Sequence, residues 1–259
     1  MTRDRSEAVR VIRNTWIPMS DGCRLAARVW LPPGSETTPV PAILEYIPYR
    51  KGDLMAPVDA RIGPWFAAHG YVYVRVDLRG AGDSEGGLLD EYLPQEQDDA
   101  VEAIAWIADQ PWATGDVGMI GFSWGGFNGL QVAARRPPQL KAVISMLSTD
   151  DRYADDVHYM GGALLTRNLT WASLMLAYMA LPPDPETVGD AWRAMWFTRL
   201  NESVPNIDPW LTHQRRDRYW KHGSVCEAYD AIECPVYMVG GWADGSCGSS
   251  TATVVSARG

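Results

Sequence analysis

A serine between two glycines is the strongest chemical signal in this sequence. The segment Gly121-Phe122-Ser123-Trp124-Gly125 follows an apolar run at residues 117–120 and leads directly into a helical pattern at 124–136. A Gly-x-Ser-x-Gly turn from a strand into a helix lifts the serine hydroxyl out of the sheet, and the helix N-terminus stabilises developing negative charge. We predict that Ser123 is a nucleophile; the alternative is a purely structural glycine turn.

An attacking serine also needs donors for the oxyanion that forms on the substrate. The backbone N–H of Trp124, directly after the nucleophile, is the first predicted donor. The second should come from the loop at residues 46–53, which lacks a His-Gly-Gly-Gly run. The hydroxyl of Tyr49 is therefore the candidate, although Tyr49 could equally be a packing aromatic beside a proline.

A serine is a weak nucleophile unless a histidine removes its proton and a carboxylate orients that histidine. In proteins whose serine lies in a Gly-x-Ser-x-Gly turn from a strand into a helix, the carboxylate follows the serine along the chain, and the histidine comes last. Asp244 comes just after the apolar run at residues 235–239. It is the predicted acid, with a turn-forming Asp-Gly pair as the alternative.

The histidine of such a triad is the missing part. All four histidines precede the predicted acid: His69, His158, His213 and His222. We interpret His69 as the end of a helix and the other three as structural residues. A less favoured alternative is that His158 or His222 swings over Ser123 and acts as the base.

A glycine-containing loop follows the apolar run at residues 71–76. Asp77 and Arg79 are predicted to pair and hold this loop rigid, with a catalytic role as the less favoured alternative, while Gly80 and Gly82 act as turn residues. The loop lacks the Lys-Ser/Thr pair of a phosphate-binding loop, so we expect no cofactor. The cysteines lack the spacing of a zinc site or a disulfide framework, and we expect reduced thiols and no metal: Cys23, Cys226, Cys234 and Cys247.

Charge and hydropathy narrow the classes of partner. The formal net charge is −9, and no basic cluster is present that would displace counterions from phosphate, so we expect no nucleic-acid partner. No run of about 18 apolar residues could span a bilayer, and the polar first residues do not resemble an export signal. We expect no membrane association, a cytoplasmic location and a small-molecule or short-peptide partner; a homo-oligomer is compatible with this composition.

Strands and helices alternate along the chain. Helical patterns at residues 60–69 and 96–108 separate short apolar runs, which predicts a doubly wound, mostly parallel α/β sheet of the α/β-hydrolase type. The predicted strands are an N-terminal antiparallel hairpin at 9–18 and 23–31, then 41–47, 71–76, 117–120, 142–147 and 235–239.

A block rich in Trp, Tyr, Met and Pro separates the last two predicted strands and shows no strand pattern. We interpret it as a helical cap inserted over the active edge of the sheet. The predicted division is therefore a core at residues 1–148, a cap at 149–234, a core strand with the acid turn at 235–245, and an unstructured tail at 246–259.

Taken together, several segments resemble the cocaine esterase and X-prolyl dipeptidyl peptidase group of α/β hydrolases, which also includes α-amino acid ester hydrolases and glutaryl-type acylases. The matching stretches are Pro48-Tyr49-Arg50-Lys51, Asp77-Leu78-Arg79-Gly80-Ala81-Gly82-Asp83-Ser84, Gln110-Pro111-Trp112, Gly121-Phe122-Ser123-Trp124-Gly125-Gly126, Asp151-Arg152-Tyr153-Ala154-Asp155-Asp156, Tyr219-Trp220 and Gly241-Trp242-Ala243-Asp244-Gly245.

The resemblance implies an acyl-enzyme on Ser123, with Asp244 as the triad acid and with Tyr49 and the Trp124 amide as the oxyanion hole. It implies cleavage of ester or amide bonds, including X-Pro dipeptidyl bonds, and a cap whose aromatics line the acyl pocket. The substrate stays open. The pair Asp155-Asp156 would bind a substrate ammonium group or, as the favoured alternative, stay solvated.

The sequence departs from the family pattern after Asp244. Family members continue through a helix and a strand to a Gly-Pro-Trp-x-His-type segment with the triad histidine, and then to a jelly-roll β domain. Neither follows here, so we expect that these parts are missing through truncation. The second hypothesis is accordingly a catalytically impaired remnant that keeps the scaffold without the triad histidine.

Overall fold

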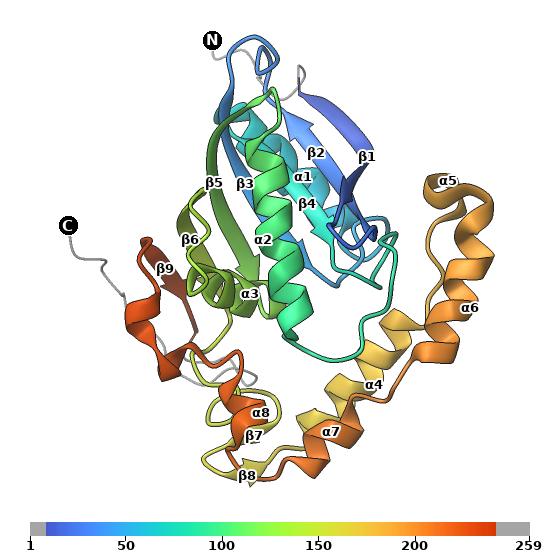
Figure 1. The fold of residues 1–259 in the computed structure, drawn as a ribbon, viewed down its shortest axis with the longest axis vertical. Coiled ribbons are helices and arrows are strands. Elements are labelled where there is room, and N and C mark those ends of the chain that lie inside the picture. Colours follow the sequence, from blue (N-terminus) through green and yellow to red (C-terminus); the bar gives the residue numbers. More distant parts are fainter. Residues whose placement is uncertain (1–8, 242–259) are drawn as a thin grey trace.

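A twisted seven-stranded sheet forms the centre of the computed structural model, which describes residues 9–241 (Figure 1). In sheet order the strands are β1 (Arg10–Pro18), β2 (Arg24–Leu31), β4 (Val72–Asp77), β3 (Val40–Ile47), β5 (Ala113–Phe122), β6 (Leu140–Met146) and β9 (Val236–Val239). Neighbours from β4 to β9 are parallel, whereas β1 and β2 form an antiparallel hairpin at one edge. The predicted mostly parallel sheet with an N-terminal hairpin is confirmed.

Helices cover both faces of this sheet, with α1 (Ala56–Ala68) on one face and α2 (Pro94–Ala108) and α3 (Trp124–Ala133) on the other (Figure 1). Successive side chains of a strand point to opposite faces. In β4, Tyr73 stacks on Phe66 of α1 at 5.3 Å between ring centroids, while Val72 and Val74 join the main core with α2 and α3. Strand β4, near the centre of the sheet, is buried along its whole length, as expected for a strand that is covered on both faces.

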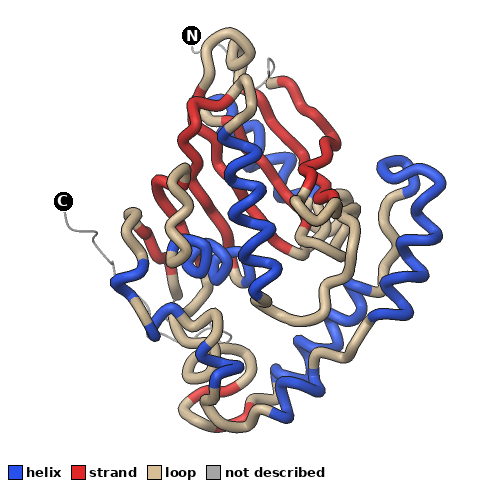
Figure 2. Tube along the Cα trace, viewed as in Figure 1, coloured by secondary structure: helices blue, strands red, loops and turns tan. Residues whose placement is uncertain are grey.

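Between β6 and β9 the chain leaves the sheet and forms an insertion, which Figure 2 shows as mostly helix and loop beside the edge where the parallel strands end. Its elements are β7 (Tyr159–Met160), β8 (Ala163–Leu164), α4 (Arg167–Met179), α5 (Pro185–Val188), α6 (Trp192–Glu202), α7 (Ile207–Thr212) and α8 (Arg218–Lys221). The expectation of no strands here is wrong for the hairpin β7–β8, because Gly161 and Gly162 adopt positive φ and close a tight turn. Within residues 9–241, no helix is long and apolar enough to cross a bilayer.

Candidate active site

Ser123 lies at the turn between β5 and α3, in a backbone conformation that residues other than glycine rarely adopt. Its φ is 53°, in the region that favours glycine, and holding another residue there costs about 1–3 kcal/mol. Its N–H donates to the Met146 carbonyl at 2.8 Å, and its carbonyl accepts from the Gly126 N–H at 2.8 Å. The turn leaves Ser123 partly exposed at the carboxyl edge of the sheet.

The glycines on both sides of the serine are required for steric reasons. A Cβ on Gly121 would lie 2.4 Å from the backbone of Gly125, and a Cβ on Gly125 would lie 2.3 Å from Cγ2 of Ile47. Real Cβ atoms do not approach other atoms this closely. The Gly-x-Ser-x-Gly spacing therefore reflects close packing of β5, α3 and β3 around the turn.

Tyr49 reaches the same point from the loop after β3. Its hydroxyl donates to Ser123 Oγ at 3.2 Å and accepts from the Trp124 backbone N–H at 3.4 Å. Burial raises the pKa of Tyr49 above its usual value, so the phenol keeps its proton. The structure thus brings Ser123, Tyr49 and the Trp124 amide together, and Tyr49 is more than a packing aromatic.

Buried charges fix the loop that carries Tyr49. The Lys51 backbone N–H donates to Asp77 Oδ1 at 2.7 Å, and the Lys51 ammonium donates to Asp83 at 2.6 Å. The Asp83 backbone N–H donates to the other oxygen of Asp77 at 3.1 Å. Asp77 therefore ties two loops together directly behind Tyr49.

The predicted pairing of Asp77 with Arg79 is wrong. Arg79 points away from Asp77 and donates to Asp99 of α2 at 2.7 Å, and it also pairs with Asp21 at 2.8 Å. Asp77 is occupied by backbone N–H groups and by the nearby Lys51 ammonium. Sequence spacing could not reveal these partners because they come from distant segments of the chain.

A cavity of about 250 Å³ opens beside Ser123. Its lining combines aromatic side chains with two carboxylates and includes Tyr92, Phe127, Trp171, Glu91 and Asp156. The core supplies the first two of these, whereas α4 supplies Trp171. The space can accommodate a small organic group next to the serine hydroxyl.

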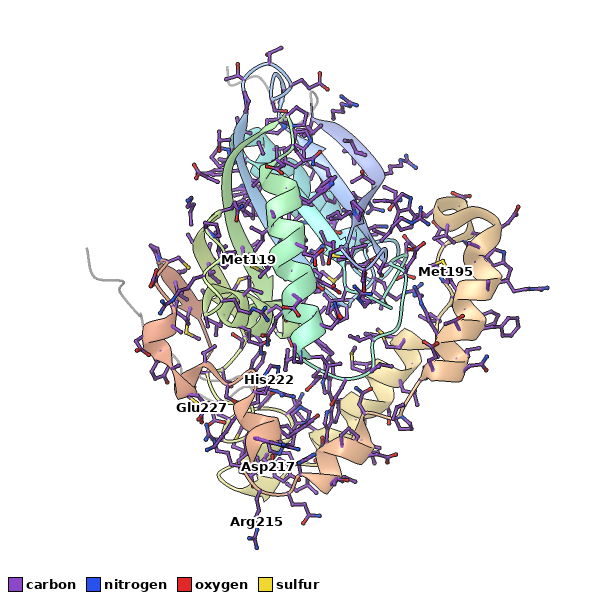
Figure 3. All side chains as sticks on the ribbon, viewed as in Figure 1. Met119, Met195, Arg215, Asp217, His222 and Glu227 are labelled. Carbon is purple, nitrogen blue, oxygen red and sulfur yellow. The ribbon has the colours of Figure 1, made fainter. Side chains whose placement is uncertain are left out.

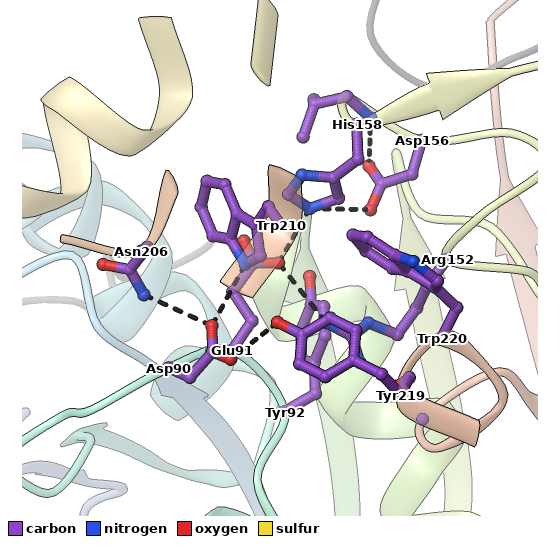
Figure 4. A network of polar contacts seen from close by, with 12 residues as sticks. Asp90, Glu91, Tyr92, Arg152, Asp156, His158, Asn206, Trp210, Tyr219 and Trp220 are labelled. Atoms are coloured by element: carbon purple, nitrogen blue, oxygen red, sulfur yellow. Dashed lines mark hydrogen bonds and ion pairs between the residues drawn. The ribbon is translucent and has the colours of Figure 1, made fainter. Parts of the chain in front are cut away.

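Glu91 is the centre of a buried polar network that joins the core to the insertion (Figure 4). Its carboxylate accepts from Trp171 Nε1 at 2.5 Å and from His158 Nε2 at 2.9 Å, with an Arg152 nitrogen 3.7 Å away. Burial by itself would raise the pKa of Glu91, but His158 and Arg152 outweigh it and lower the pKa. Burial would lower the pKa of His158, yet Glu91 and Asp156 raise it above its usual value. Glu91 and His158 therefore form a carboxylate–imidazolium pair.

The neighbouring Asp90 makes a second set of contacts with the insertion. It accepts from Tyr219 Oη at 2.6 Å, from Trp210 Nε1 at 3.0 Å and from Asn206 Nδ2 at 3.4 Å (Figure 4). One short core loop, at residues 90–92, therefore contacts several separate segments of the insertion.

Asp156 is buried and lines the cavity, so the expectation that the pair Asp155-Asp156 is solvated is wrong for Asp156. Burial is the main reason that its pKa is raised to about 7. One oxygen accepts from the Val157 backbone N–H at 2.7 Å, and the other lies 3.9 Å from His158 Nε2. The carboxylates at this wall are therefore matched by the cations of His158 and Arg152.

The four histidines have other partners, and within residues 9–241 no hydrogen bond joins a histidine to Ser123. His158 is fully buried, with Nδ1 2.8 Å from Asn168 Oδ1 and Nε2 on Glu91. His222 lies near the start of α2, where its Nε2 is 2.8 Å from the Tyr92 carbonyl (Figure 3). His213 bonds to Asp217, and His69 bonds to the carbonyl of Trp65.

The predicted acid, Asp244, lies outside the described residues. Sequence reasoning overlooked two carboxyl groups near Ser123, Glu91 and Glu96, both of which are buried. Glu96 lies in the first turn of α2, where an acidic residue is ordinary, and the sequence around Glu91 carries no motif. Only the fold reveals that both side chains point inward.

The mostly parallel sheet and the turn between β5 and α3 define an α/β hydrolase fold. The family model of X-Pro dipeptidyl-peptidase (S15 family) matches residues 21–258. The chain belongs to this family.

Individual relatives agree with this assignment. Cocaine esterase from Rhodococcus sp. is 31% identical over 273 aligned residues, which cover 96% of this chain and 46% of the esterase. An α-amino acid ester hydrolase structure matches with a TM-score of 0.69 at 24% identity, over 94% of this chain and 44% of that one. A CocE/NonD family hydrolase from Staphylococcus aureus matches with a TM-score of 0.67 at 23% identity, over 87% of this chain and 40% of that one.

These two solved structures support the fold, and the chain spans less than half the length of each of the three relatives.

Proposed function

We propose that this chain carries the nucleophile and the oxyanion donors of a serine hydrolase that cleaves ester or amide bonds by acyl transfer. The observation that carries the proposal is the contact of Tyr49 with both Ser123 Oγ and the Trp124 amide. These two donors lie beside the nucleophile, where a carbonyl oxygen would acquire negative charge. The Trp124 N–H donates to the Tyr49 hydroxyl, which donates to Ser123 Oγ, so both groups lie beside the strained serine.

In the proposed reaction Ser123 Oγ forms a bond to the substrate carbonyl carbon and loses its proton to a general base. The tetrahedral oxyanion accepts hydrogen bonds from Tyr49 and the Trp124 amide. The intermediate expels an alcohol or an amine, which takes up the proton, and leaves an acyl group on Ser123. Water then releases the acid and restores the serine. We assign the orienting acid to Asp244, whose place after β9 follows the expected order.

The insertion at residues 149–234 acts in this proposal as a cap that shapes the acyl pocket. Trp171 and Asp156, both from the insertion, line the cavity beside Ser123, which supports this division of the chain. Because the carboxylates are balanced by His158 and Arg152, we favour a small apolar or aromatic acyl group over a substrate ammonium group.

A fluorophosphonate probe tests the assignment of the nucleophile. The probe should form one adduct, and peptide mass spectrometry should locate it on Ser123. Ser123→Ala should abolish labelling, whereas Ser173→Ala, which alters an exposed serine of α4, should not. An adduct on any other residue would contradict the proposal.

The second candidate is a scaffold that has lost most of its catalytic power. The observation in its favour is that none of the four histidines hydrogen-bonds Ser123, since each has another partner. Loss of one triad member costs several orders of magnitude in rate, although an oxyanion hole retains part of the catalysis. A serine that reacts with the probe but gives no ester turnover would support this candidate.

A further inference from the structure

We propose that Glu96 is a positioning residue of the active site, which holds the oxyanion-hole turn and the pocket wall in register with each other. The inference rests on the proposed function, because it concerns the same serine. Glu96 contacts the side chain of Trp124, whose amide is a proposed oxyanion donor, and the backbone of Tyr92, which lines the cavity. It touches neither Ser123 nor the space for a substrate, so its effect must pass through these two residues.

Each carboxyl oxygen of Glu96 has a different task. Oε1 accepts from the Trp124 indole Nε1 at 2.5 Å, and Oε2 accepts from the Tyr92 backbone N–H at 2.9 Å. Glu96 is 4% exposed, and Trp124 is 1% exposed, so water cannot replace either bond. A single side chain from the first turn of α2 therefore connects the start of α3 with the loop before α2.

Both ends of this connection are held in conformations that need support. Tyr92 has a φ of 56°, and Ser123, next to Trp124, has a φ of 53°. The Tyr92 ring packs against Trp124 at 5.2 Å and against Phe127 at 5.0 Å between centroids. Strained residues of this kind persist only where the surrounding contacts fix them. Removing the carboxyl group would free both to relax.

The electrostatic surroundings indicate the protonation state in which Glu96 makes these two contacts. Burial is the main cause that raises the pKa of Glu96 to about 8, and the nearby Glu91 carboxylate raises it further. Other titratable groups nearby are the Tyr46 phenol, whose pKa burial raises, and Arg79 and Asp99, which pair with each other. At neutral pH Glu96 is therefore mainly uncharged. A glutamine in its place could keep the Trp124 contact through its one oxygen, but its amide nitrogen could not accept from the Tyr92 N–H.

The molecule offers a control for this contact. Trp196 of α6 donates its indole N–H to the Ala180 carbonyl at 2.7 Å. Trp196 does not line the cavity beside Ser123. If Glu96 acts by positioning Trp124, then loss of the indole N–H at Trp124 must affect the serine more than the same loss at Trp196.

The test compares the rate of fluorophosphonate labelling at Ser123 in the full chain. We expect Glu96→Ala to slow labelling by about tenfold or more, since one preorganised donor can be worth 10²–10³. Glu96→Gln should restore part of the rate, because its oxygen can accept from the Trp124 indole whereas its amide nitrogen cannot accept from the Tyr92 N–H. Trp124→Phe should slow labelling no more than Glu96→Ala, and the double variant should be no slower than Glu96→Ala alone, because the two side chains act as one unit. Trp196→Phe should label at close to the wild-type rate.

An NMR measurement keeps this test separate from the proposed function. The indole N–H resonance of Trp124, assigned by its loss in Trp124→Phe, should shift in Glu96→Ala while the other indole resonances report an intact fold. Labelling of Glu96→Ala at the wild-type rate overturns the positioning role. If the wild-type protein is not labelled, the proposed function fails. The NMR signal then tests the Glu96–Trp124 contact by itself, and a Trp124 signal that does not shift in Glu96→Ala overturns that contact.

Discussion

Glu91 and Glu96 lie five residues apart in one short segment, and their carboxyl groups differ in the direction of their pKa shifts. Glu91 and Glu96 are both buried, and each accepts a hydrogen bond from a tryptophan indole at 2.5 Å. Yet the pKa of Glu91 is lowered, whereas burial raises the pKa of Glu96 to about 8. The difference lies in the remaining neighbours. Glu91 lies beside the cations of His158 and Arg152. The donors to Glu96 are the neutral Trp124 indole and the Tyr92 backbone N–H.

The comparison teaches that partner charges, and not burial alone, decide whether a carboxyl group is ionised. Glu91 serves as an anion that binds the insertion to the core through a charged contact. Glu96 serves as a neutral acceptor that joins two parts of the core beside Ser123. One segment thus supplies a charged contact with the insertion and an uncharged contact with the turn that carries Ser123.

The largest expected effect on stability comes from removing Glu91, the ionised glutamate of the two. Glu91→Ala should lower the free energy of unfolding by about 3–5 kcal/mol, because His158 and Arg152 would remain buried without their counterion. Glu96→Ala should cost less, about 1–3 kcal/mol, because it leaves only neutral N–H donors unsatisfied. Urea unfolding at pH 7 followed by tryptophan fluorescence measures both.

Glu233→Ala provides the surface control. Glu233 pairs with Arg136 while its side chain stays 67% exposed, so its loss should change stability by no more than about 0.5 kcal/mol. If Glu91→Ala proved no more costly than Glu96→Ala, the two sites would not differ in charge as described.

A smaller effect should appear in the pH dependence of stability. The pKa of Glu96 is about 8 in the folded chain against an ordinary value of 4.5, so the folded state keeps a proton that the unfolded state releases. Stability must therefore fall as pH rises from about 4.5 to about 8, and then level off. One pKa unit is worth about 1.4 kcal/mol, and we expect at least this loss from Glu96 between pH 5 and pH 8.

Glu96→Gln isolates this contribution because glutamine cannot ionise. The difference in unfolding free energy between Glu96→Gln and wild type should shift in favour of the variant by at least about 1.4 kcal/mol from pH 5 to pH 8. For Glu91 the sign is opposite. Its lowered pKa stabilises the fold above the ordinary glutamate value, and this stability is lost as the pH falls. Parallel pH curves for the Glu96→Gln variant and wild type would refute the contrast.

Most of the fold could be predicted from the sequence because its signals are local. The apolar runs and the helical patterns between them identified every strand of the sheet and the order of its helices, with errors only at the ends. β5, for example, begins at Ala113 and not at residue 117, because the Thr114-Gly115-Asp116 stretch resembles a turn. The Gly161-Gly162 hairpin of the insertion was overlooked because its two strands are only two residues long, which is too short to give an alternating pattern.

The candidate site was predictable where chemistry imposes a motif and unpredictable where the fold imposes a contact. Ser123 and Trp124 follow from the spacing of the glycines. For Tyr49 the residues alone left a packing role equally open, and the family resemblance favoured the role of a donor. Glu91 and Glu96 could not be found in this way. The tryptophan and histidine side chains that bind them lie 28 to 80 residues away along the chain, and no local pattern records that these side chains turn inward.

Ester turnover by wild type and by Ser123→Ala tests the central claim most directly. With p-nitrophenyl acetate as the substrate, wild type should exceed the Ser123→Ala background. Tyr49→Phe, which removes one hydroxyl group, should lower kcat by roughly 10²–10³. Equal rates for wild type and Ser123→Ala would contradict the claim that Ser123 is a working nucleophile in this chain.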